Sequence, residues 1–308
     1  MHHSFRRLLL SAAALAALQT AAAQPDVLRN DDLSSMSNWF NSSNSGMSLA
    51  AGGLAVNMGR HALTYFTEYG SFQTLGNDKT LQVTFDLSFT TVGQSPGGFR
   101  VGLFDSNGAT RPTSANNAST GFQYYDGYLF SWNPNPGSSS NALRLSARTP
   151  KSSALDTLLS STATSTYSVV GSSGGPSGQV FQTGTTYQAT YTVSRGSGSG
   201  LTFEFSVTGG SLVDFSNSFA ITSPRTNAFD AFAIYSVSDD LNKTPAVYGS
   251  NYNIDNFIVS YFDTPKLGAN STEPAIPEPS TYAACAGAAV LGLAFWRRRR
   301  AAAKAAVA

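Results

Sequence analysis

The stretch LQVTFDLSFT, residues 81–90, decides the fold of this chain. Its odd-numbered positions are apolar (Leu, Val, Phe, Leu, Phe), and its even-numbered positions are polar (Gln, Thr, Asp, Ser, Thr). Because successive side chains of a β-strand point to opposite faces, this pattern predicts a strand with one buried and one exposed face. The same alternation returns in YQATYTVS (187–194) and LTFEFSV (201–207).

Further strands are predicted where apolar residues cluster between turn-forming segments rich in Gly, Asn and Ser. They cover residues 99–104, 124–132, 143–147, 229–237 and 252–262. The segment 229–237 is apolar on both faces, which predicts a central strand. Residues 152–178 are rich in Ser, Thr and Gly and predict a long surface insertion. No amphipathic helix of normal length lies between the strands, so the fold class is all-β, a β-sandwich or jelly roll.

The N-terminus has the order of features of a secretory signal peptide. Two arginines precede an apolar stretch at residues 8–18, and Ala21 and Ala23 form a small-residue cleavage motif before Gln24. We therefore expect residues 1–23 to pass through the secretion translocon and to be removed by signal peptidase. The mature protein would begin at Gln24.

An uncharged segment near the C-terminus predicts a short transmembrane helix. Residues 281–296 would span roughly 24 Å as a helix, whereas a hydrocarbon core is about 30 Å thick. Local thinning of the bilayer and snorkelling of the flanking arginines would make up the difference. The alternative is a buried core helix with a solvated basic tail, but the signal peptide argues against it. The arginines that stop and orient the helix are Arg297, Arg298, Arg299 and Arg300,.

The tripeptide Pro277, Glu278 and Pro279, followed by the apolar segment and the arginines, resembles the PEP-CTERM sorting signal of Gram-negative bacteria. The three features occur in the order and spacing of that family within residues 276–300. The resemblance implies recognition by exosortase, a transpeptidase-like membrane enzyme that processes proteins near the tripeptide. It also implies association with exopolysaccharide and biofilm. The tail 301–308 departs from the many members that end soon after the arginines.

The expected organisation follows from these segments. It comprises a signal peptide (1–23), a β-sandwich domain (24–263), an extended linker (264–276), a sorting signal (277–300) and a cytoplasmic tail (301–308),. The precursor would be anchored in the inner membrane of a Gram-negative-type bacterium. The processed protein would reach the cell surface or the extracellular matrix.

The exported body also resembles the jelly-roll modules of concanavalin-type lectins and glucanases. This resemblance rests on FRVGLFDSNG (99–108), YQATYTVSR (187–195) and YNIDNFIVSYF (252–262). Residues 24–276 contain 12 Lys and Arg and 17 Asp and Glu, a net charge of −5, which offers no electrostatic footprint for nucleic acid,. The only cysteine, Cys285, lies in the predicted helix, so the body has neither a disulfide nor a thiolate site,.

The scarcity of histidine and of paired acids predicts a protein that is not an enzyme. His61 is the one histidine that remains after the signal peptide, and neither G-x-S-x-G nor H-E-x-x-H accompanies it,. We expect it to be a surface residue beside a strand. Glycoside hydrolysis usually needs two carboxylates about 5–10 Å apart. Glu204 and Asp86 each stand alone in their strands, although a pair across strands is an alternative.

Aromatic side chains around residues 124–132 are the candidates for contact with a glycan. Tyr and Trp stack on sugar faces, and Asn or Asp can bind the hydroxyl groups. The alternative is that alternate members of this strand fill the core. The candidate residues are Tyr124, Tyr125, Asp126, Tyr128 and Trp132.

Two loops offer the hard oxygen ligands that calcium prefers. The candidate ligands are Asp105, Asn107, Asp239 and Asp240. Asn-Gly after a strand equally predicts a hairpin turn, and the spacing of an EF-hand is missing. We therefore expect no cofactor, with calcium as the alternative.

Taken together, these features predict an exported, non-enzymatic protein of the cell surface or polysaccharide matrix. Its role would be structural, adhesive or carbohydrate-associated. The alternative is a carbohydrate-active enzyme, a glycoside hydrolase or lyase, on a concanavalin-like fold.

Overall fold

The computed structural model describes a large part of the exported body. The described residues are 25–41, 46–50, 53–94, 98–112, 122–135, 143–150, 158–159, 166–172, 179–213, 215–237 and 249–264. All of them belong to the compact unit Met1–Thr264, and the second unit, Pro265–Ala308, lies outside them. The predicted signal peptide and sorting signal therefore lie outside the described residues. Within the described ranges, no helix has the length and apolar character needed to cross a bilayer.

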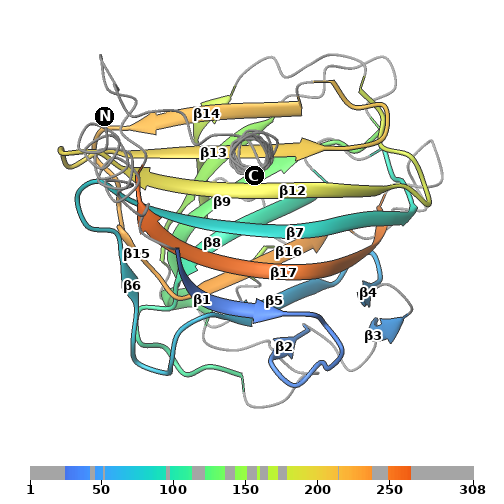
Figure 1. Cartoon of the computed structure of the whole chain (residues 1–308), viewed down its shortest axis with the longest axis horizontal. Coiled ribbons are helices and arrows are strands. Elements are labelled where there is room, and N and C mark those ends of the chain that lie inside the picture. The colour runs from blue at the N-terminus through green and yellow to red at the C-terminus, as the bar shows by residue number, and fades with distance from the viewer. Residues whose placement is uncertain are drawn as a thin grey trace, which may run out of the picture. The chain divides into compact units, whose positions relative to one another are not determined.

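The larger sheet of the body is antiparallel and has the strand order β14-β13-β12-β7-β17-β4-β3, with β1 paired to β17. The long strands β7 and β17 lie side by side at its centre (Figure 1). Its eight strands are β1 (Asp26–Asp31), β3 (Met47–Ala50), β4 (Gly53–Val56), β7 (Lys79–Thr91), β12 (Thr186–Arg195), β13 (Leu201–Thr208), β14 (Phe215–Ile221) and β17 (Asn251–Asp263).

The smaller main sheet lies behind the first in Figure 1 and has the order β11-β10-β9-β8-β16-β5-β2. Its seven strands are β2 (Trp39–Phe40), β5 (His61–Tyr65), β8 (Phe99–Asp105), β9 (Asp126–Trp132), β10 (Arg144–Arg148), β11 (Tyr167–Ser172) and β16 (Ala231–Ser236). A short pair, β6 (Gln73–Thr74) and β15 (Ala228–Phe229), stands apart from both sheets. The predicted all-β sandwich, of the jelly-roll class, is confirmed for the described residues.

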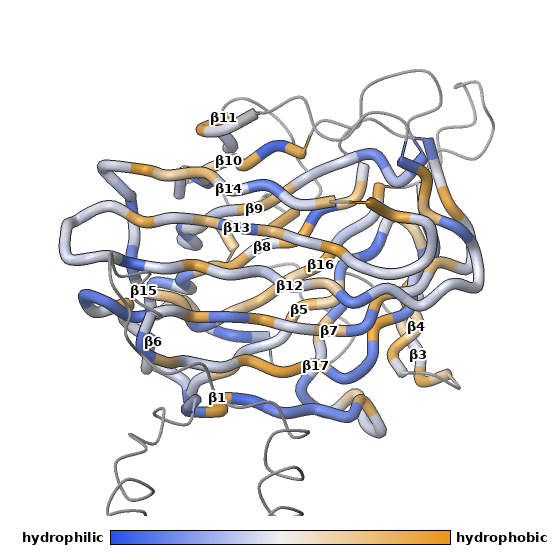
Figure 2. Tube along the Cα trace, turned by 45° about the horizontal axis from the view of Figure 1, so that its top comes forward, coloured by the Kyte–Doolittle hydropathy of each residue, from blue (hydrophilic) through white to orange (hydrophobic). Residues whose placement is uncertain are grey.

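The main hydrophobic core fills the space between the two sheets. The apolar positions of β7, β12 and β13 are buried and their polar positions face outward, as the alternation predicts. Figure 2 shows this change of hydropathy along the three strands. Aromatic rings join the sheets: Phe85 lies 5.5 Å from Phe232, and Trp132 lies 5.0 Å from Phe205, measured between ring centroids.

A second hydrophobic core covers the outer face of the seven-stranded sheet. Segments 122–125 and 158–159 supply buried side chains to it, so β8, β9, β16 and β5 are buried on both faces. Arg148, whose side chain is fully buried, ties these segments to the sheet. Its guanidinium donates to the backbone oxygens of Phe122 (2.7 Å), Tyr125 (3.1 Å) and Leu158 (3.2 Å).

This second core corrects the interpretation of residues 152–178 as a surface insertion. Leu158 and Leu159 are fully buried, and β11 forms the edge of the seven-stranded sheet. The composition of the stretch indicates exposure because Ser, Thr and Gly outnumber its apolar residues. Leu158 and Leu159 nevertheless pack in the second core, whereas Val169 and Val170 of the edge strand β11 are exposed.

Other predicted strands agree with the structure more closely. The segment 229–237 contains β16, which lies between β8 and β5 and is central, as expected. The strand expected at residues 124–132 begins only at Asp126, because residues 122–124 form a 3₁₀ turn. The described strands before residue 75 and the edge strand β14 were not predicted, because none of them shows a long apolar-polar alternation.

Candidate functional site

The structure places most of the predicted glycan-contacting residues away from solvent. Tyr125, Tyr128 and Trp132 are at most 1% exposed, so the prediction that they contact a glycan is wrong. Tyr128 and Trp132 fill the main core, which is the alternative role considered for alternate residues of this strand. Tyr124 is 52% exposed, and Asp126 is half-buried and forms an ion pair with Arg225 at 3.3 Å.

Tyr125 is buried because it belongs to the second core. Its hydroxyl group shares a hydrogen bond with the hydroxyl of Tyr65 on β5, and its ring packs 5.3 Å from that of Phe122. Burial raises the pKa of both tyrosines, so both hydroxyls stay protonated. The covered sheet face therefore presents no open platform of aromatic rings among the described residues.

Asp105 and Asn107, two of the calcium candidates, form a turn. The amide of Ala109 donates to the carbonyl oxygen of Ser106 (2.9 Å), and Asn107 and Gly108 between them have φ of 53° and 71°. These are the dihedral angles of a tight turn with positive φ at both central residues. The turn does not close a hairpin, because β8 pairs with β9, which begins at Asp126, and with β16. One carboxylate oxygen of Asp105 accepts from the amide of Asn107 (2.7 Å).

Calcium binding itself stays a prediction. Within the described ranges, no three His, Cys, Asp or Glu side chains form a group able to hold a metal ion. Asp239 and Asp240 lie outside the described residues.

His61 is buried in β5, which corrects the expectation of a surface residue. Its ring packs 5.7 Å from Phe122 in the second core, and neither ring nitrogen has a hydrogen-bond partner in the structure described here. Burial, with a smaller effect of Arg60, lowers the pKa of the imidazole to about 4. The group is therefore neutral near pH 7.

Glu204 and Asp86 do not form a carboxylate pair. Both face outward from the eight-stranded sheet, but β12 separates their strands, and Glu204 is level with Gln82 through Thr192. Asp86 is two strands away from Glu204 and four residues further along β7 than Gln82, so the backbones of the two acids are roughly 16 Å apart,. Asp86 instead accepts a hydrogen bond from the side chain of Asn256 (2.7 Å).

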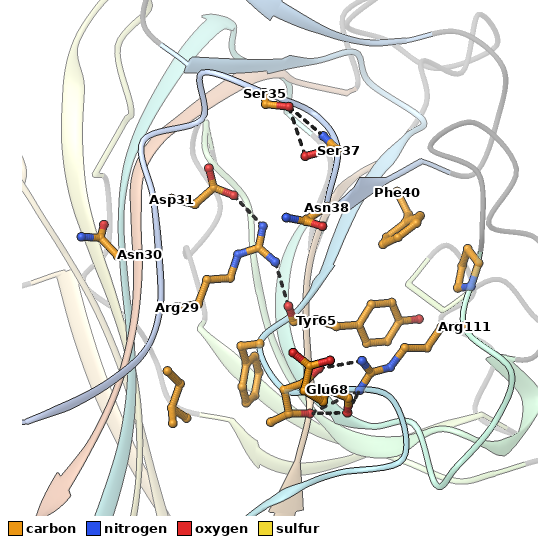
Figure 3. Close-up of a pocket in the computed structure, with 14 residues that line it drawn as sticks. Arg29, Asn30, Asp31, Ser35, Ser37, Asn38, Phe40, Tyr65, Glu68 and Arg111 are labelled. Carbon is orange, nitrogen blue, oxygen red and sulfur yellow. Dashed lines mark hydrogen bonds and ion pairs between the residues drawn. The ribbon is translucent and has the colours of Figure 1, made fainter.

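A different part of the body forms a pocket. We call it the Arg29–Arg111 pocket; it has a volume of about 730 Å³, and Figure 3 shows side chains from three separate segments around it. It is lined by Leu28, Arg29, Asn30, Asp31, Ser35, Ser37, Asn38, Phe40, Tyr65, Phe66, Thr67, Glu68, Arg111 and Pro112. The pairing of β1 with β17 and of β2 with β5 brings the first two segments together.

On one side of the pocket, Arg29 and Asp31 neutralise each other. Their ion pair measures 2.5 Å, and Arg29 also donates to the backbone oxygen of Tyr65 (2.7 Å). Asp31 accepts further hydrogen bonds from the indole of Trp39 (3.0 Å) and the amide of Leu33 (2.9 Å). This network holds the start of the pocket wall in one conformation, because each charged group has several partners.

On the other side, Arg111 holds the loop that follows β5. It donates to the backbone oxygens of Thr67 (2.7 Å) and Glu68 (3.2 Å) and stacks 4.2 Å from the ring centroid of Tyr65. Its counterion is Asp230, at 3.0 Å, which also accepts from the amide of Ser106 (2.8 Å). Burial raises the pKa of Asp230, while its hydrogen bonds with Ser106 and Arg111 act in the opposite direction.

The groups left to meet a ligand are mostly neutral. The side-chain amide of Asn38 is exposed and makes no hydrogen bond within the described part of the chain, whereas the side chain of Asn30 lies on the opposite side of β1 from Arg29 and Asp31 (Figure 3). Phe40 is half-buried in the lining, and Tyr69, 63% exposed, lies at the rim, 5.8 Å from the guanidinium of Arg111. Glu68 supplies one exposed carboxylate.

None of these pocket residues was predicted from the sequence. They come from segments far apart in the chain, and no spacing motif connects them. The one local signal is Thr67-Glu68-Tyr69-Gly70, where an acid and an aromatic residue follow a buried run.

A family model of the PEP-CTERM protein-sorting motif matches residues 275–300. The chain thus carries the predicted sorting motif, which marks it as an exported, sorted protein. The match lies outside the described residues, so the positions of Pro277, Glu278, Pro279 and Arg297–Arg300 in three dimensions are not part of the structure described here. A comparison with curated protein sequences finds no match.

Several solved structures resemble the body. The metal-free carbohydrate recognition domain of Emp46p is 11% identical, with 77% of this chain and 95% of that chain covered and a TM-score of 0.45. The lectin from Bauhinia forficata in complex with GalNAc is 14% identical (78% and 100% covered, TM-score 0.43). The endo-1,3-beta-glucanase from Streptomyces sioyaensis is 12% identical (80% and 100%, TM-score 0.42). These likenesses concern the fold and assign neither a ligand nor an activity to this chain.

Proposed function

We propose that this protein is a non-enzymatic component of the cell surface or extracellular matrix that binds a neutral polysaccharide in the Arg29–Arg111 pocket. Exosortase would process the precursor at the sorting motif after its export. The bound polymer would then connect the protein to exopolysaccharide or biofilm. This places the predicted carbohydrate association at a pocket instead of on the strand 124–132.

The observation that supports this proposal is that the charged groups of the pocket are paired with each other, whereas neutral groups are left without a partner. Arg29 is paired with Asp31 and Arg111 with Asp230, so neither arginine is left with an unmatched charge. The unbonded side-chain amide of Asn38 can both donate and accept hydrogen bonds, which suits the hydroxyl groups of a sugar. Phe40 and the rim residue Tyr69 add the aromatic faces on which pyranose rings pack,.

A glycan-array screen of the full-length protein, purified in detergent, tests the proposal. We expect binding to neutral glycans, and titration with the best ligand should show that Asn38→Ala weakens the affinity about fivefold, the equivalent of one hydrogen bond. Tyr69→Ala should weaken it by at least as much. Both side chains are exposed, so neither change should lower the melting temperature appreciably.

The matched control is Tyr124→Ala, which removes a tyrosine of similar exposure outside the pocket. We expect its affinity to equal that of the wild type. If Tyr124→Ala abolishes binding while Tyr69→Ala does not, the glycan binds beside the 3₁₀ turn, and the pocket assignment fails.

Hydrolysis is the second candidate function, because two carboxylates line the same pocket. Glu68 is exposed, and Asp31 is oriented by Arg29 and Trp39. Glycoside hydrolases use such a pair, one as acid and one as base or nucleophile. A reducing-sugar assay on the ligand from the array decides between the two functions. Release of sugar that Glu68→Gln abolishes would show an enzyme, whereas binding without release supports the proposal.

A further inference from the structure

A second hollow, of about 380 Å³, has a different electrostatic character from the Arg29–Arg111 pocket. It lies between the turn that joins β12 to β13 and the segment 222–227 that joins β14 to β15. Its lining consists of Arg195, Ser199, Thr222, Ser223, Pro224, Arg225, Thr226 and Asn227. Two arginines and no carboxylate line it; Arg225 is paired with Asp126 beside the hollow, so Arg195 supplies its unmatched positive charge on a body whose net charge is negative.

Arg195 is oriented without being neutralised. Its Nε donates to the backbone oxygen of Gly198 (3.1 Å), and its Nη1 donates to that of Leu75 (3.0 Å). These acceptors are uncharged, and no carboxylate within the described ranges pairs with Arg195. The guanidinium therefore has no carboxylate partner among the described residues, and its Nη2 is left to donate.

Arg225 is also oriented by its partners, and unlike Arg195 it has a counterion. Its Nε donates to Asp126 (3.3 Å), while its backbone amide donates to the hydroxyl of Tyr128 (2.7 Å). The neighbouring Thr226 donates to Asp105 (3.1 Å), which fixes the segment further. Both Nη groups of Arg225 make no hydrogen bond among the described residues, and 44% of its side chain is exposed.

Neutral donors complete the lining. The hydroxyls of Ser199, Thr222 and Ser223 are unbonded within the described part of the chain. Two oriented guanidinium groups surrounded by hydroxyls are the donor set that recognises a carboxylate or sulfate, because such groups accept several charge-assisted hydrogen bonds. We propose that this hollow binds an oxyanion group, a carboxylate or a sulfate ester, carried by an acidic polysaccharide. The proposal concerns a site separate from the Arg29–Arg111 pocket and does not depend on it.

Calorimetric titration of the full-length protein in detergent tests the proposal with four probes: a galacturonic acid hexamer, dextran sulfate, neutral dextran and inorganic sulfate. We expect at least one of the two acidic polymers to bind, and neutral dextran to bind at least about tenfold more weakly. The acidic polymer that binds more tightly shows whether the hollow prefers a carboxylate or a sulfate ester. If neither binds, or if dextran binds equally well, the proposal is wrong. If inorganic sulfate binds as tightly as the polymers, the polysaccharide part of the proposal is wrong.

Substitutions of the two arginines test whether the acidic polymer binds in this hollow. Arg195→Gln and Arg225→Gln should each weaken the acidic polymer about tenfold or more, since each removes charge-assisted hydrogen bonds. Arg195→Lys keeps the positive charge but lacks the planar, forked donors of the guanidinium, so we expect a loss of affinity between those of the wild type and Arg195→Gln. Such a graded loss indicates a change in ligand recognition, because misfolding would abolish binding in both variants.

The matched control is Arg144→Gln, the same change of charge at an exposed arginine on β10. It should leave the affinity for the acidic polymer unchanged. An equal loss of affinity in this variant would mean that binding depends only on the net charge of the protein, and the proposed site would be wrong. Asn38→Ala should also leave acidic binding unchanged. This keeps a failure of the oxyanion site distinguishable from a failure of the neutral-glycan pocket.

Discussion

His61 should make the stability of the β-sandwich depend on pH between about 4 and about 6.5. Burial lowers the pKa of its imidazole to about 4 in the folded protein, whereas the unfolded chain has a value near 6.5,. Between these values the unfolded state binds a proton that the folded state does not bind. The free energy of unfolding is therefore full above about pH 6.5 and falls as the pH falls toward about 4.

The size of the effect follows from the two pKa values. Their difference corresponds to about 3 kcal/mol, because each pKa unit is worth about 1.36 kcal/mol. At pH 5 the unfolded state is almost fully protonated and the folded state is not, so about 2 kcal/mol is lost relative to pH 7. His61→Phe removes the titration but keeps an aromatic ring against Phe122.

Urea-induced unfolding of the wild type and of His61→Phe at pH 7 and pH 5, followed by tryptophan fluorescence, measures this effect. We expect the wild type to lose about 2 kcal/mol more than the variant between the two pH values. The raised pKa values of Asp126 and Asp230 act in the opposite direction, but both proteins contain these groups, so their contribution cancels. Equal losses in the two proteins, within about 0.5 kcal/mol, would refute the reasoning.

Three further predictions concern the covering segments, the core and the sorting signal. Arg148→Met should lower the free energy of unfolding by about 3 kcal/mol or more, because the buried backbone oxygens of Phe122 and Tyr125 lose their arginine donor and that of Leu158 keeps only the hydroxyl of Tyr167; an unchanged urea midpoint would contradict this,. The body, residues 24–263, should show β-structure and cooperative melting by circular dichroism in reductant and EDTA, and a spectrum that requires calcium would show a structural metal. Pro277→Ala with Pro279→Ala should leave membrane insertion intact but block processing in an exosortase-containing host, as followed by pulse-chase, since the prolines keep the tripeptide extended.

Features that depend on neighbouring residues in the chain could be read from the sequence. The alternation in residues 81–90 predicted which side chains of β7 face the core, and β12 and β13 follow the same rule. A strand exposed on one face carries this information locally, with a period of two residues. The sorting motif is equally local, because its tripeptide, apolar segment and arginines are contiguous.

The tertiary structure decided what covers the other face of each strand. The alternation of a half-buried strand is lost where distant segments bury its second face, as segments 122–125 and 158–159 do for the seven-stranded sheet. This is why Tyr125 and His61 are buried although the sequence suggested exposure. The Arg29–Arg111 pocket exists only where three remote segments meet: β2 pairs with β5, and Arg111 bonds to the loop that follows β5. A local pattern indicates that a residue is apolar or charged, but its exposure and its partners depend on contacts between parts of the chain that the pattern does not connect.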